Sequence, residues 1–96
     1  MYRATTTATV YPFCEQYGCY WFIDVINSYQ TARFRQANEF QVWKLVLNKT
    51  GNGAKVICED GNSNILLTQK IQFTDYKGPE LVLWLENETI YFPEER

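Results

Sequence analysis

The side chains that could do chemistry in this chain are three cysteines and a few separated carboxylates. Cys14, Cys19 and Cys58 form no CxxC pair, and the chain contains no histidine. A Cys/His zinc site is therefore excluded, and three thiolates would need an acidic fourth ligand. We interpret the cysteines as buried or half-buried thiols in a reducing cytoplasm, and we expect no metal and no cofactor.

The carboxylates Asp24, Asp60 and Asp75 belong to different predicted elements, so their spacing assigns no catalytic pair. Asp60 and Asp75 fall at predicted turns, where aspartate accepts hydrogen bonds from local amides. Asp24 is either a solvated residue of a helix's polar face or a half-buried acceptor that ties the helix to a strand or loop. We treat Asp24 and Asp75 as structural polar residues and expect no enzyme, because an active site built on them would need both in one cleft.

Basic side chains next to aromatic ones suggest an alternative, a small regulatory protein that binds nucleic acid. Arg33 and Arg35 flank Phe34, and Lys55 borders a predicted strand turn. Such groups suit a surface that holds a single strand. They are equally typical of a solvated loop, and the net charge of −2 does not favour a polyanion.

The elements that must position these residues begin with two helices. Apolar residues recur at helical spacing in Gly18–Gln30, on the side formed by Trp21, Phe22, Val25, Ile26 and Tyr29. A shorter helix is predicted over Val10–Tyr17, with Thr9 as its N-cap and Gly18 as the left-handed residue that ends it. Residues 1–8 are interpreted as an extended lead-in, residues 9–30 as the helical part, and residues 31–38 as a frayed helix end that leads into a loop.

Residues 39–92 have the composition of β-strands. Four apolar or alternating segments and a last short one are separated by turn sequences at Asn48–Gly53, Asp60–Asn64, Tyr76–Pro79 and Asn87–Glu88. Short turns join antiparallel neighbours, so we expect an antiparallel meander of four to five strands. The predicted fold class is α+β, with two N-terminal helices packed on one face of the meander sheet, in a single domain over residues 1–96.

Two short helices can cover only one face of such a sheet. The predicted strands carry apolar residues on both faces, so some Trp and Val side chains are expected on an open face, with Trp43, Val82 and Trp84 as candidate interface anchors. The alternative is that these are isolated exposed apolar residues around a bulge. Our leading hypothesis is an uncharacterised, non-catalytic interaction domain whose partner is itself or another protein, bound through an apolar face or edge of the sheet.

The apolar segments are too short to span a bilayer, and the first residues do not resemble a signal peptide. We therefore expect a soluble cytoplasmic protein. The sequence assigns no small-molecule site and no membrane partner.

Several segments resemble one family of small bacterial and phage-associated domains of unknown function. The similarity lies in GCYWFIDVINSYQ, FQVWKL, CEDGNSN, TQKIQFTDY and the closing YFPEE, with the family pattern YWxIDxIxSxQ, FQVWxL, CxDGNxN and TQxIxFTD. The chain departs from the pattern at Cys19 and Pro12. The resemblance implies the α+β fold and a bacterial or phage origin, and it carries no activity, cofactor or partner.

Overall fold

The computed structural model describes residues 3–49 and 52–95. The first two positions of the predicted lead-in, and positions 50 and 51 of the predicted Asn48–Gly53 turn, lie outside the described residues. The elements follow in the order β1 (Thr5–Thr6), α1 (Val10–Tyr17), α2 (Tyr20–Ser28), α3 (Ala32–Ala37), β2 (Phe40–Leu47), β3 (Ala54–Glu59), β4 (Ile65–Ile71), β5 (Leu81–Glu86), β6 (Thr89–Tyr91) and the 3-10 turn η1 (Pro93–Glu95). The predicted α+β class is confirmed.

Helix α1 has the predicted bounds because its two ends are determined locally. Pro12 is its third residue, where a backbone N–H would have had no partner. Gly18 ends the helix with a φ of 69°, and its N–H and that of Cys19 both donate to the carbonyl oxygen of Cys14. Thr9 occupies the N-cap position, but its hydroxyl makes no capping hydrogen bond.

Helix α2 turns a slightly different face to the sheet from the one predicted. Phe22, Ile23 and Ile26 are buried, whereas Trp21 is half-buried at the margin of the core. The prediction omitted Ile23 from the buried face, because it centred the apolar side on the large aromatic residues, including Trp21.

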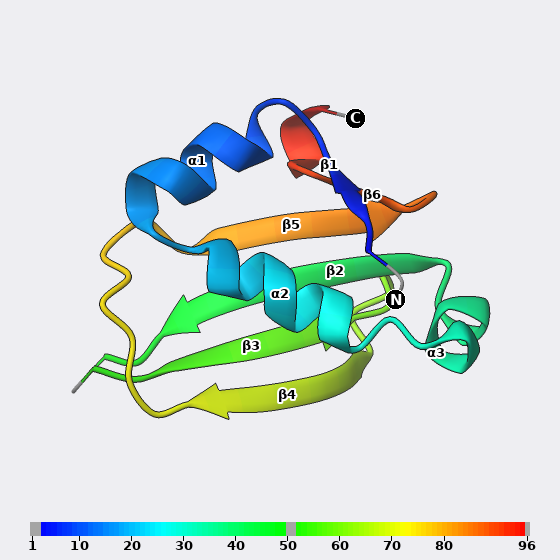
Figure 1. The fold of residues 1–96 in the computed structure, drawn as a ribbon. Helices are drawn as coiled ribbons and strands as arrows, with labels where there is room; N and C mark the ends of the chain where they lie inside the picture. Colours follow the sequence, from blue (N-terminus) through cyan, green and yellow to red (C-terminus); the bar gives the residue numbers. More distant parts are fainter. Residues whose placement is uncertain (1–2, 50–51, 96) are drawn as a thin grey trace.

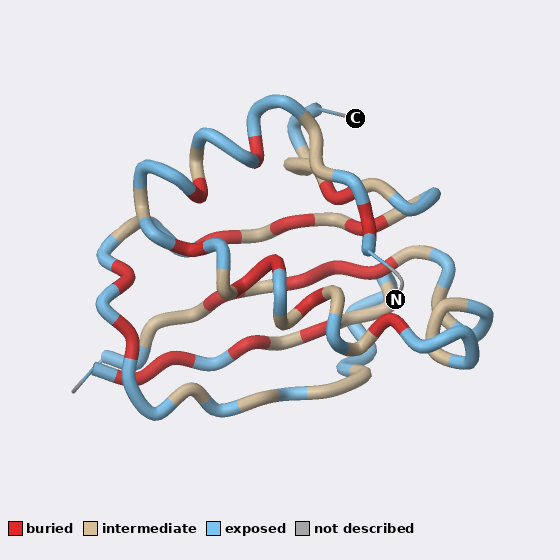
Figure 2. Tube along the Cα trace, viewed as in Figure 1, coloured by how far each residue is buried: buried red, intermediate tan, exposed pale blue. Residues whose placement is uncertain are grey.

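The two longer helices lie across one face of the sheet, and α3 lies beside the end where β2 begins (Figure 1). The frayed segment predicted for residues 31–38 is therefore a separate short helix. Thr31 begins it by accepting a hydrogen bond from the Phe34 N–H at 3.2 Å. The core lies between the helices and the sheet, where the buried positions of α2, β2, β3 and β5 face one another (Figure 2).

The sheet has six strands in the order β1-β6-β5-β2-β3-β4 and is mixed, so the predicted meander is wrong. Strand β5 pairs with β2 and not with its predecessor β4, with Val42 opposite Trp84 and Trp43 opposite Leu83. The predicted lead-in also contributes a strand, since Thr5 and Thr6 pair in parallel with β6.

Burial explains why β5 takes a central place. Its sequence LVLWLE buries Leu81, Leu83 and Leu85 on one side and carries Val82 and Trp84 on the other. A strand that is apolar on both faces belongs inside a sheet, whereas the more polar ILLTQKI of β4 suits an edge. In the connection between the two strands Tyr76 is fully buried, and its hydroxyl donates to the Pro79 carbonyl oxygen at 2.5 Å.

Candidate functional site

One face of the sheet, here called the open face, carries the side chains that alternate with those of the core. Since Trp43, Val56, Leu83 and Ile90 point toward the helices, their strand neighbours point away. None of the described helices lies over this face (Figure 1). The open face consists of Phe40, Val42, Lys44, Val46, Lys55, Ile57, Glu59, Thr68, Lys70, Val82, Trp84, Glu86 and Tyr91. Most of these side chains are half-buried, so they keep contact with solvent.

Aromatic rings form a row at one end of the open face. The ring centroid of Trp84 lies 5.3 Å from that of Phe40 and 6.1 Å from that of Tyr91, both in edge-to-face geometry. Gly61 makes room for this row, because a Cβ at that position would lie 2.7 Å from the Phe40 ring. The Tyr91 hydroxyl donates to Glu86 Oε1 at 3.0 Å. The rings are therefore held in fixed positions before any partner binds.

Charged residues of opposite sign occupy opposite corners of the open face. Lys55 and Lys70 are cross-strand partners toward the β4 edge, at the end where β2 finishes. Glu86 pairs with Phe40 at the other end, on β5. Between the corners, Lys44 and Glu59 form an ion pair at 2.9 Å. The face thus has a basic corner, an acidic corner beside the aromatic row, and an ion pair between them.

Trp43 is not part of this face, so its assignment as an interface anchor is wrong. Its side chain is fully buried on the helix side, 5.8 Å from the Tyr29 ring. The register places Val42, not Trp43, opposite Trp84, so the two tryptophans point to opposite sides of the sheet. Val82 and Trp84 remain on the open face as expected.

The buried indole of Trp43 belongs to a polar network that the sequence did not reveal. Its Nε1–H donates to Gln41 Oε1 at 2.8 Å, and Gln41 exchanges two amide hydrogen bonds with Gln30. Arg35 adds to this network by donating to the Gln30 carbonyl oxygen at 2.6 Å. These contacts hold α2 and α3 against the start of β2. We therefore assign these polar groups a structural role.

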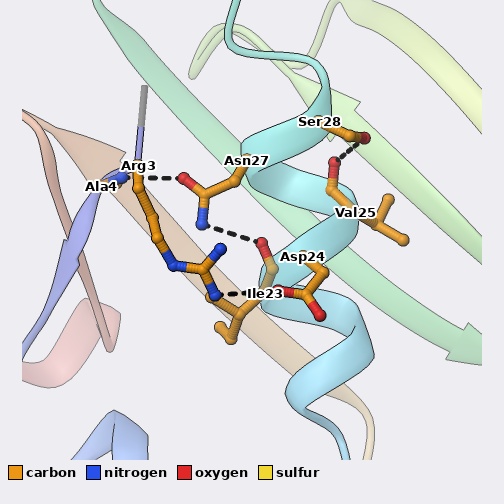
Figure 3. Close-up of polar contacts among 7 residues, drawn as sticks. All are labelled: Arg3, Ala4, Ile23, Asp24, Val25, Asn27 and Ser28. Carbon is orange, nitrogen blue, oxygen red and sulfur yellow. Dashed lines mark hydrogen bonds and ion pairs between the residues drawn. The ribbon is translucent and has the colours of Figure 1, made fainter. Parts of the chain in front are cut away.

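Asp24 is exposed and forms an ion pair with Arg3 at 3.0 Å (Figure 3). It is therefore solvated, as in the first alternative, and it is not the half-buried acceptor of the second, although it does tie α2 to the segment before β1. The neighbouring Asn27 carries the more buried tie, since its Oδ1 accepts from the Ala4 N–H at 2.8 Å. The sequence does contain a signal for this role of Asn27, because Asn27 lies one turn after Asp24 on the same side of the helix.

Asp75 lies apart from the cavity that Asp24 lines. It is exposed in the connection between β4 and β5 and is not among the residues that line that cavity. Asp60 accepts from the N–H groups of Asn62 and Asn64, as expected at a turn. Hydrogen bonds from the Asn64 side chain and from these amides lower the pKa of Asp60. In the described part of the chain, no group of three or more acidic or cysteine side chains gathers around a possible metal position.

The basic residues of the alternative hypothesis are also separated. Arg33 and Arg35 lie on α3, which leads into the first residue of β2, whereas Lys55 pairs with Val46 near the strand's other end. Six residues along a strand span about 20 Å. Arg35 is further held by its hydrogen bond to Gln30. The three side chains therefore form no common basic surface.

Comparisons with known proteins place the chain in a family. A family model described as a family of unknown function, DUF6876, matches residues 1–96. The chain belongs to this family. The match agrees with the resemblance to a small domain of unknown function, and DUF6876 brings no activity or ligand with it. No curated protein and no solved structure matches the chain. Across the part of this DUF6876 member that the structure describes, the helices are all too short or too polar to cross a membrane.

Proposed function

We propose that this chain is a non-catalytic interaction domain that associates with a second copy of itself through the open face. The observation that carries the proposal is the aromatic row of that face, where Trp84 lies between Phe40 and Tyr91 and no described helix covers them. Half-exposed aromatic residues in fixed positions are typical of the anchors that dominate protein interfaces. The free thiols Cys14, Cys19 and Cys58 fit the reducing cytoplasm that we propose as its compartment.

The charges favour a second copy over an unrelated partner. A two-fold contact must be complementary to itself, so each charged corner must meet a corner of opposite sign. When two open faces meet about a suitable axis, the Lys55 and Lys70 corner of one copy lies over the Glu86 corner of the other. Such pairing steers association and weakens as salt is added.

Sedimentation velocity across a range of protein concentrations tests the proposal. The wild-type chain should form dimers, and Val82→Lys should shift the dimer dissociation constant upward by at least tenfold, because it places a further charge on the open face two residues from Trp84. Gln16→Lys is the matched control, since Gln16 is exposed on α1, on the helix side of the sheet. Lys70→Glu should weaken the dimer at low salt more than at high salt. A wild-type chain that stays monomeric, or equal dimerisation of Val82→Lys and wild type, would overturn the proposal.

A further inference from the structure

A second surface lies on the helix side of the molecule, away from the open face. A cavity of about 490 Å³ opens between β1, α1 and α2. This volume lies within the range of small-molecule sites in proteins, roughly 300–1,000 Å³. All the residues that line it belong to the described part of the chain.

The cavity has an apolar floor. It is built from Ala4, Val10, Cys14 and Ile23, each of which is at most 7% exposed. These residues come from α1, α2 and the segment just before β1, so the floor depends on the packing of that segment against both helices. An apolar group that enters the cavity would leave water and contact this apolar surface, which is energetically favourable.

Two tyrosines form a wall beside the floor. Tyr11 of α1 is 59% exposed and Tyr20 of α2 is 38% exposed, and their ring centroids are 5.2 Å apart. Of the large apolar and aromatic side chains that the structure describes, four are exposed, and Tyr11 and Tyr20 are two of them. Desolvation and the adjacent Tyr11 hydroxyl raise the pKa of Tyr20 to about 12. The phenol of Tyr20 can donate a hydrogen bond to a ligand.

Opposite charges lie at the mouth of the cavity. The Arg3 guanidinium and the Asp24 carboxylate contact each other at 3.0 Å, with side chains 65% and 62% exposed (Figure 3). An ion pair this exposed adds little to stability, so it opens at little cost. Each partner can then bind a ligand group of opposite charge.

We propose that this cavity binds a small zwitterion with an apolar side chain, of the α-amino-acid class. The side chain lies on the floor against the tyrosine wall, the carboxylate binds Arg3 and the ammonium group binds Asp24. A zwitterion binds both Arg3 and Asp24, whereas an anion or a cation alone binds only one of them. The site is separate from the open face, so it does not rest on the proposed dimer.

Titration calorimetry with L-phenylalanine tests the inference, with N-acetyl-L-phenylalanine and L-phenylalanine amide as probes that each lack one charge. L-Phenylalanine should bind, and each derivative should bind at least tenfold more weakly. Asp24→Asn should abolish the preference for the free ammonium group, and Arg3→Gln the preference for the free carboxylate. Both side chains are exposed, so these variants should fold, which circular dichroism checks.

Arg33→Gln is the matched control, because Arg33 is also exposed but lies on α3, outside the cavity. It should bind L-phenylalanine as the wild type does. Repeating the titration in the Val82→Lys background separates this site from the dimer contact. Absence of heat at millimolar L-phenylalanine, equal binding of the blocked derivatives, or a loss in Arg33→Gln as large as in Arg3→Gln would overturn the inference.

Discussion

Gln30 and Gln41 hydrogen-bond to each other through both side-chain amides, at 2.7 and 2.9 Å, although each residue is at most 3% exposed. This pair joins the end of α2 to the start of β2. In the described residues, every buried side-chain nitrogen and oxygen atom has a hydrogen-bond partner. The polar pair therefore adds specificity to the core without leaving an unpaired group.

Removing half of this pair should be costly. Gln41→Leu leaves Gln30 Oε1 and the Trp43 indole N–H without their partner, so we expect the free energy of unfolding to fall by about 3 kcal/mol. Urea denaturation measures the change. Gln36→Leu on the exposed side of α3 is the control and should change stability by less than about 0.5 kcal/mol. Equal midpoints for the two variants would contradict the role of the network.

The turn between β5 and β6 offers a stabilising substitution. Asn87 and Glu88 both have positive φ, 52° and 61°, a conformation in which glycine is favoured at the second position. Glu88→Gly should raise the free energy of unfolding by about 1 kcal/mol, because a residue with a Cβ is strained there. Glu88→Ala keeps the strain and removes the carboxylate, so it should give no such gain. If alanine stabilises as much as glycine, the carboxylate and not the backbone is responsible.

Alkaline pH should destabilise the chain through two buried acids. Burial raises the pKa of the Cys58 thiol to about 12, with smaller contributions from Glu59 and Asp60, and burial raises that of the Tyr76 phenol to about 12. In the unfolded chain these groups ionise at their ordinary values of 9.0 and 10.0. Between those values and 12 the folded chain binds more protons, so its stability falls as pH rises and is unaffected below pH 9.

Denaturation midpoints measured across this pH range test that expectation. Cys58→Ala removes one of these two acids, so its stability should fall less steeply from pH 9 onward than that of the wild type. Identical slopes for the two chains would show that Cys58 does not contribute to the alkaline loss.

The position of the core within α2 can be tested by two neighbouring substitutions. Phe22 is fully buried, so Phe22→Ala should cost about 4 kcal/mol. Trp21 is half-buried, so Trp21→Ala should cost only about 2 kcal/mol despite the larger ring. Thermal unfolding of both variants shows which substitution costs more stability. A larger loss of stability in Trp21→Ala than in Phe22→Ala would mean that the core is centred on the side of α2 predicted from the sequence.

The sequence predicts local features well because their causes are local. Gly18 ends α1 through its own φ, and Asp60 shapes its turn with neighbouring amides, so both were predictable. The order of the strands was not, because β5 joins β2 through contacts distant in sequence. Alternation divides β2 into two faces but does not say which one the helices cover. The side chain of Gln41 is polar but lies on the buried side of β2. Polarity along β2 therefore does not identify the face that the helices cover.

The place of β5 between β6 and β2 has a consequence for synthesis on the ribosome. Strands β2, β3 and β4 can pair as soon as they emerge, but the inner edge of β2 stays unsatisfied until residues 81–86 arrive. Until then the nascent chain presents a hydrogen-bonding edge rich in valine and leucine to its surroundings. Chaperones that shelter such edges should therefore matter most for this chain while its second half is being translated.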